Sequence, residues 1–82
     1  MRKSIYTAES EVLRQVLQRI RVRVGLRQED LAARLGKPQS FVSKYESGQR
    51  RLDFLEIREI CRAVGIALDE FVRDFEAAVR KR

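Results

Sequence analysis

The sequence contains no histidine and a single cysteine, Cys61. The absence of histidine excludes a His-ligated metal site, a Ser–His–Asp triad and a Cys–His pair. One cysteine forms no disulfide within a chain, which fits a reducing, cytoplasmic compartment, and we expect Cys61 to be an inert buried thiol. The sequence also has no glycine-rich phosphate loop and no nucleophile signature. We therefore expect no enzyme activity, no metal and no cofactor.

Turn-forming residues and long apolar runs are also scarce. One proline and four glycines among 82 residues are too few for a β fold of many strands. Charged residues make up 37% of the chain and recur every few positions, which leaves no run of about 18 apolar residues to span a membrane. Because 44% of the residues are hydrophobic, the chain is apolar enough to fold. These features indicate one small, all-helical domain.

Positive charge is in excess, with 18 Lys and Arg against 12 Asp and Glu, for a net charge of +6. A small basic domain is typical of proteins that bind nucleic acids. RNA is the weaker possibility, because no interleaved exposed aromatic residues offer a stacking platform. Arg14, Arg19 and Arg23 are expected to form a solvated face that adds only long-range attraction.

The spacing of the apolar residues predicts five helices, since residues three and four positions apart share one helix face. Thr7 is a plausible N-cap of the first helix, and Asp53 with Glu56 has the pattern of a capping box before the fourth. Val24 and Leu55 are assigned to the apolar faces of the first and fourth helices. The expected elements are a tail over 1–6 and helices over 7–24, 28–35, 38–47, 54–64 and 68–80.

Residues 28–47 have the pattern of a helix–turn–helix, with the small Ala32 where the two helices approach and Gly36 in the tight turn. Val42 and Tyr45 are expected to anchor its second helix in the core. Phe41 is open to two interpretations, packing against the helix edge or contact with a thymine methyl. The outer face carries four hydrogen-bonding residues, Gln39, Ser40, Ser43 and Lys44.

Three segments carry a resemblance to a known family: GLRQEDLA at 25–32, PQSFVSKYESG at 38–48 and RLD at 51–53. They resemble the phage-repressor/Cro-type family, also called the xenobiotic-response-element (XRE) family, and the likeness covers about residues 12–72. The resemblance implies an all-α, compact, five-helix, lambda-repressor-like DNA-binding domain. Its second and third helices would form the reading motif.

The resemblance also implies roles for individual residues. The implied base contacts are Gln39, Ser40, Ser43 and Lys44. The implied phosphate contacts are Gln28, Arg50 and Arg51. We also expect a phosphate contact from Lys37, as a residue of this sequence that can point outward from the turn. Arg21 matches an arginine that, in some relatives, forms a structural ion pair with the residue matching Glu46. Two positions depart from the family pattern: Lys37, where many relatives carry an apolar residue, and Ala67, where relatives often carry a Ser or Thr cap.

The fifth helix carries an apolar stripe that extends to Phe75 and Val79. These two side chains could pack against the first helix or against another subunit. We favour a homodimer with Phe75 and Val79 on the partner surface, because two recognition helices about 34 Å apart read successive major grooves.

Together these features predict a sequence-specific, double-stranded DNA-binding transcriptional regulator, most simply a repressor, with no membrane segment. The alternative is an antitoxin that binds a protein toxin and its own operator, with the fifth helix facing the toxin. A restriction-system controller protein of similar size is a third possibility.

Overall fold

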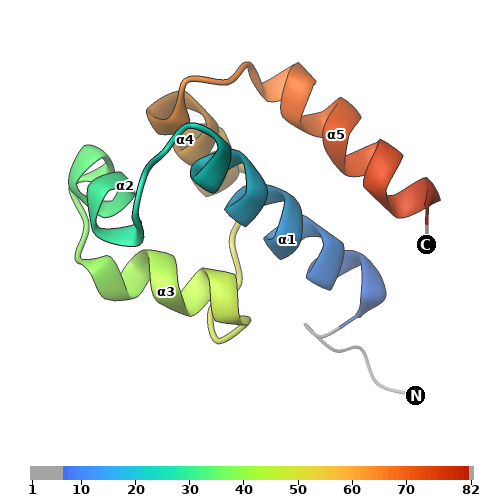
Figure 1. Cartoon of the computed structure of the whole chain (residues 1–82). Helices are drawn as coiled ribbons and strands as arrows, with labels where there is room; N and C mark the ends of the chain where they lie inside the picture. The colour runs from blue at the N-terminus through green and yellow to red at the C-terminus, as the bar shows by residue number, and fades with distance from the viewer. Residues whose placement is uncertain (1–6, 82) are drawn as a thin grey trace.

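The computed structural model describes residues 7–81 and consists, over this range, of five α-helices and no strands (Figure 1). The helices are α1 (Ala8–Arg23), α2 (Gln28–Leu35), α3 (Gln39–Ser47), α4 (Phe54–Val64) and α5 (Leu68–Arg80). The predicted all-α class is confirmed. Relative to the predicted ranges, α1 is one residue shorter at each end and α3 begins one residue later. The tail expected over residues 1–6 lies outside the described range. No helix among the described residues is long and apolar enough to cross a membrane.

Two of the helix starts are set by local side-chain caps. The Thr7 hydroxyl oxygen accepts a hydrogen bond from the Ser10 amide at 3.1 Å, ahead of α1. At the start of α4, Asp53 accepts from the Glu56 amide at 2.8 Å and Glu56 accepts from the Asp53 amide at 2.9 Å. This reciprocal pair is a capping box, and it satisfies two amides that the helix leaves without partners. Ala67, which precedes α5, provides no side-chain cap.

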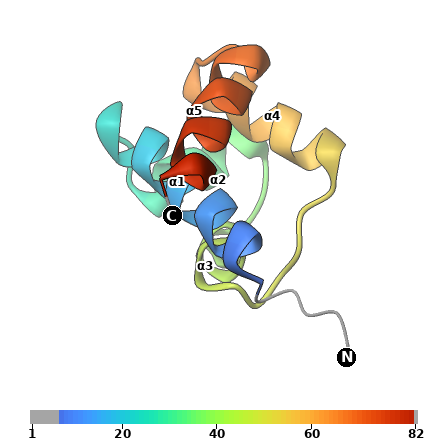
Figure 2. The same ribbon diagram turned by 90° about the vertical axis from the view of Figure 1, so that its right-hand side faces the viewer.

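Helix α1 lies between α3 and α5. It packs against α3 on one side and α5 on the other, while α4 packs against α2 and α5. Both views show α5 and α3 on opposite sides of α1 (Figures 1 and 2). The pair α2 and α3 forms the predicted helix–turn–helix, and α3 lies at the edge of the molecule with one side free of other helices (Figure 1).

The core lies where the inner faces of all five helices meet. The side chains with almost no exposure are Val16, Leu17, Ile20, Leu31, Val42, Tyr45, Ile60 and Cys61. Phe71 of α5 closes this cluster and is 4% exposed. Burial raises the pKa of the Cys61 thiol to about 11, so this side chain stays protonated and unreactive at neutral pH.

Two residues assigned to the apolar faces of their helices are exposed, so those assignments were wrong. Val24 is 49% exposed because it follows the last turn of α1, where the chain has left the helical path. Leu55 is 68% exposed because it lies in the first turn of α4, which meets the core only further along, through its second half.

The turn between α2 and α3 depends on the backbone conformation of Gly36. This residue has φ 70° and ψ 32°, in the left-handed region. Its amide donates to the Ala33 carbonyl at 3.1 Å, and the Lys37 amide donates to the Ala32 carbonyl at 2.9 Å. A Cβ added at Gly36 would meet no other atom within 4 Å. The need for glycine is therefore conformational and does not arise from crowding.

A buried ion pair joins α1 to α3. Arg21 Nε lies 2.7 Å from Glu46 Oε2, and Arg21 Nη2 lies 3.0 Å from Glu46 Oε1. A third donor, Arg21 Nη1, reaches the Leu26 carbonyl at 2.8 Å. The two side chains are only 8% and 5% exposed. A bidentate pair with its remaining groups bonded offsets the cost of taking both charges out of water, and its planar geometry sets how α3 lies on α1.

We expect Gly36→Ala to lower the free energy of unfolding by about 1–2 kcal/mol, because a Cβ penalises the left-handed conformation. Gly36→Asn should cost less, since asparagine tolerates this conformation better. Urea unfolding of both variants provides the measurement. Equal losses for Ala and Asn would contradict a conformational origin.

Glu46→Leu should lower the free energy of unfolding by about 3–5 kcal/mol, because it leaves the Arg21 charge buried without a counter-ion. The double variant Arg21→Met/Glu46→Leu should recover most of that loss, since no charge then remains buried. Urea unfolding of the wild type and both variants tests this. A double variant no more stable than Glu46→Leu would show that the charge imbalance is not the cause.

Candidate nucleic-acid interface

The outer face of α3 carries all four residues predicted to contact bases. Gln39, Ser40 and Lys44 are exposed, and Ser43 is half-buried. Their neighbours on the opposite face of the same helix, Phe41, Val42 and Tyr45, are buried. Because inner and outer residues follow the period of a helix, packing the apolar face into the core leaves the polar face directed away from the domain.

The first residue of α3 is connected to the buried ion pair by a chain of hydrogen bonds. Gln39 Nε2 donates to Gln28 Oε1 at 3.2 Å, and Gln28 Nε2 donates to Glu46 Oε1 at 2.9 Å. Glu46 in turn is held by Arg21. Arg21, Glu46, Gln28 and Gln39 therefore form one network that spans α1, α2 and α3.

The contact between the two glutamines was not anticipated from the sequence. Part of its signal was present in the sequence, because Gln28 and Gln39 are the first residues of the two helices that pack together in the helix–turn–helix. Both ends of the Gln28 amide are used, whereas the Gln39 amide oxygen accepts no hydrogen bond within residues 7–81. The network thus sets the orientation of the Gln39 amide and leaves one acceptor open.

The four residues predicted to hold phosphates lie in different environments. Lys37 and Arg51 are exposed, and Gln28 is half-buried within the network described above. Arg50 is also exposed, but it is paired: its Nη1 and Nη2 lie 3.1 and 2.8 Å from the two carboxylate oxygens of Glu56. The predicted set is therefore not equally available at the surface.

Phe41 packs into the domain and is 8% exposed, which settles its two interpretations in favour of packing. Its ring lies edge-on to Tyr45, with centroids 5.5 Å apart. Lys37 Nζ and the Arg50 guanidinium carbon lie 5.3 and 4.8 Å from the ring centroid. These distances are those of cation–π contacts. The buried Phe41 ring therefore contacts two cationic side chains, one from the turn before α3 and one from the connection after it.

Carboxylates near this face are bonded to local arginines. Hydrogen bonds from Arg50 and from the Asp53 amide lower the pKa of Glu56. The Arg27 side chain and amide likewise lower the pKa of Asp30 at the start of α2. Both carboxylates therefore remain ionised at neutral pH and are paired locally. No group of three or more His, Cys, Asp or Glu side chains within residues 7–81 is arranged to hold a metal ion.

The two residues predicted to form a partner surface pack largely within the chain. Phe75 and Val79 are partly buried against the core, and the Phe71 and Phe75 rings stack with centroids 6.5 Å apart. The more exposed apolar residue on α5 is Val72, at 42%. Packing within the chain thus buries part of the apolar stripe of α5, and Val72 is the residue of that stripe that remains exposed.

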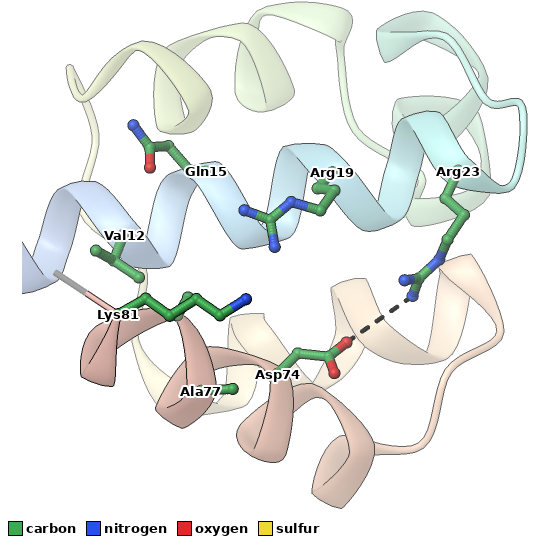
Figure 3. A pocket seen from close by; sticks show the side chains of 8 residues that line it. Val12, Gln15, Arg19, Arg23, Asp74, Ala77 and Lys81 are labelled. Carbon is green, nitrogen blue, oxygen red and sulfur yellow. Dashed lines mark ion pairs between the residues drawn. The ribbon is translucent and has the colours of Figure 1, made fainter.

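A second surface feature lies between α1 and the antiparallel α5, on the side of α1 away from α3 (Figure 3). It is an open groove of about 470 Å³ lined by Val12, Gln15, Arg19, Arg23, Asp74, Ala77, Ala78 and Lys81. Arg23 Nη2 approaches Asp74 Oδ2 across it at 3.9 Å. Two arginines predicted to be merely solvated, Arg19 and Arg23, therefore line a cationic groove.

Comparisons with known proteins agree with this architecture. Residues 17–71 match a family model described as "Helix-turn-helix". A protein of Rhodospirillum rubrum named "Uncharacterized transcriptional regulator in ATPase CF(0) region" is 32% identical over 74 residues, covering 90% of this chain and 68% of its own length. A solved "XRE-family like protein" from Pseudomonas syringae pv. tomato is 42% identical, with a TM-score of 0.81 and coverage of 89% of both chains.

A wild-type restriction-modification controller protein shares the fold at lower identity. It is 21% identical, with a TM-score of 0.87 over 93% of this chain and 99% of its own. The family match spans most of the chain and includes the network that links α1, α2 and α3. The chain belongs to the helix–turn–helix family of the XRE type.

Proposed function

We propose that this protein is a sequence-specific regulator of transcription that binds double-stranded DNA with α3 in the major groove. The observation that carries the proposal is the outer face of α3, where four hydrogen-bonding side chains are presented by a helix locked through Arg21 and Glu46. A rigidly held helix with a polar outer face is what reading base edges requires, because base contacts depend on side chains held in register.

Gln39 is the strongest candidate for a base contact. A glutamine pairs with adenine by donating from its amide nitrogen to N7 and accepting from N6 at its amide oxygen. One Nε2 hydrogen of Gln39 already points to Gln28, which leaves the second hydrogen and the free oxygen for a base. The hydrogen bond to Gln28 thus holds the amide in advance of binding. Ser40, Ser43 and Lys44 would contact neighbouring bases from the same face.

Gln28, Lys37 and Arg51 would hold phosphates on either side of α3 and set the register of the protein on the duplex. The net charge of +6 strengthens binding to any DNA and makes it sensitive to salt. Occupying a promoter in this way would repress transcription. We place the protein in the cytoplasm, because its single buried thiol forms no disulfide within the chain and fits a reducing compartment.

We further propose that the protein acts as a homodimer through α5. Val72 is exposed, and Phe75 and Val79 on the same helix are only partly covered by the core. A dimer would place two copies of α3 on one side of the duplex, about 34 Å apart, and so read two half-sites.

Selection from a random duplex library at two salt concentrations tests base reading. We expect a pseudo-palindrome to be enriched, and Gln39→Ala to reduce discrimination at one position of each half-site by about 1–3 kcal/mol. Gln15→Ala is the matched control, since this exposed glutamine lines the groove between α1 and α5, away from α3. If no sequence is enriched and the only binding is a sequence-independent one that weakens as salt rises, the proposal of base reading is wrong. A protein partner such as a toxin then becomes the better hypothesis.

Sedimentation over a range of concentrations tests the dimer. We expect Val72→Lys to shift the protein towards monomer and to weaken binding to the two-half-site duplex, because a charge at this apolar position must be desolvated on association. The same lysine introduced by Glu70→Lys, on the opposite side of α5, should leave the association unchanged. A wild-type protein that stays monomeric at every concentration and on DNA would contradict the proposal.

A further inference from the structure

Arg50 lies in the connection between α3 and α4, residues 48–53, and touches three parts of the molecule. Its side chain forms a bidentate ion pair with Glu56 in the first turn of α4. Its guanidinium lies 4.8 Å from the ring centroid of Phe41 in α3. Its Nη1 also donates to the Arg51 carbonyl within the connection, at 2.8 Å.

The same guanidinium therefore donates hydrogen bonds and lies over an aromatic ring. Two parallel hydrogen bonds to a carboxylate are the geometry for which a guanidinium is pre-organised. The Glu56 carboxylate also offsets the positive charge with which Arg50 would attract a phosphate. Glu56 is itself fixed, because it also accepts the Asp53 amide in the capping box of α4. The partner of Arg50 is therefore rigid and does not move away with a flexible side chain.

The start of the connection is anchored to α3 by its backbone. The Gln49 and Arg50 amides both donate to the Lys44 carbonyl, at 2.8 and 3.2 Å. The Arg50 side chain then anchors the rest of the connection to α4. Between these two anchors lies Arg51, whose exposed side chain forms no ion pair or hydrogen bond within residues 7–81.

We infer that Arg50 is a positioning residue for DNA binding: through Glu56 and Phe41 it holds the connection between α3 and α4 so that Arg51 meets a phosphate, and it does not itself hold one. The inference rests on the proposed DNA-binding function. It replaces the expectation, drawn from family resemblance, that Arg50 and Arg51 play the same role.

The first experiment measures affinity for the duplex enriched by the selection described above, at several salt concentrations. Arg50→Lys keeps the positive charge but loses the bidentate pair, and Glu56→Gln keeps the capping box but loses the negative charge. We expect each variant to weaken binding by about fivefold while the salt slope stays that of the wild type. Arg51→Ala, the matched control for a true phosphate contact, should reduce the slope by about 0.9.

Opposite results would follow if Arg50 were a phosphate ligand. Arg50→Lys would then bind nearly as well as the wild type, because lysine also holds a phosphate. Glu56→Gln would tighten binding, since it releases Arg50 and removes a negative charge near the DNA. Arg50→Ala would lower the salt slope by about 0.9, as expected for Arg51→Ala. Any of these three outcomes would overturn the inference.

A second experiment needs no DNA. Amide hydrogen exchange in the free protein should be about fivefold faster at Gln49 and Arg50 in Arg50→Lys and in Glu56→Gln than in the wild type, because the connection loses one of its two anchors. Unchanged exchange would overturn the claim that Arg50 holds the connection. If the selection enriches no duplex for the wild type, the proposed function and the role of Arg50 in DNA binding are both wrong. The exchange experiment then still tests whether Arg50 holds the connection between α3 and α4.

Discussion

The buried pair between Arg21 and Glu46 is the interaction on which the DNA-binding face depends. Two hydrogen bonds from the Arg21 guanidinium fix α3 against α1 and a third reaches the Leu26 carbonyl, in a place where both side chains are almost completely buried. Apolar packing alone tolerates small rotations of a helix, whereas a bidentate pair specifies one orientation. Glu46 also accepts from Gln28, so the same carboxylate that holds α3 in place extends its order to Gln39 at the start of that helix.

A second arrangement of the same kind lies beside the first turn of α3. Phe41 is buried, and the cations Lys37 and Arg50 lie near its ring, so the turn before α3 and the connection after it converge on one side chain. Glu56 completes this arrangement because it is both the capping residue of α4 and the partner of Arg50. Helix α3 is thus held through Glu46 near its end and through Phe41 near its start. The groove between α1 and α5 lies on the far side of α1 and is separate from both arrangements.

Much of the helical organisation could be predicted from local signals. Thr7, Asp53 and Glu56 cap helices as their residue types suggest, and Gly36 adopts the left-handed conformation expected of it. The errors were Val24 and Leu55, both near helix ends. The period of a helix assigns an inner face over its whole length, but the core need not reach both ends of that face, so the end of α1 and the start of α4 are exposed.

The sequence by itself determined the helices, the apolar face of each and the polar outer face of α3, because these depend on residues a few positions apart. Only the tertiary structure decided how Gln28 meets Gln39, where Phe41 packs and why Arg50 and Arg51 differ. Those features depend on distances between residues in different helices or turns, and the crossing of α2, α3 and α4 sets them. Arg50 and Arg51 are neighbours in sequence with the same side chain and both are exposed, yet only Arg50 is paired with Glu56. No local pattern separates them, because the difference comes from the fixed carboxylate that the fold places beside Arg50.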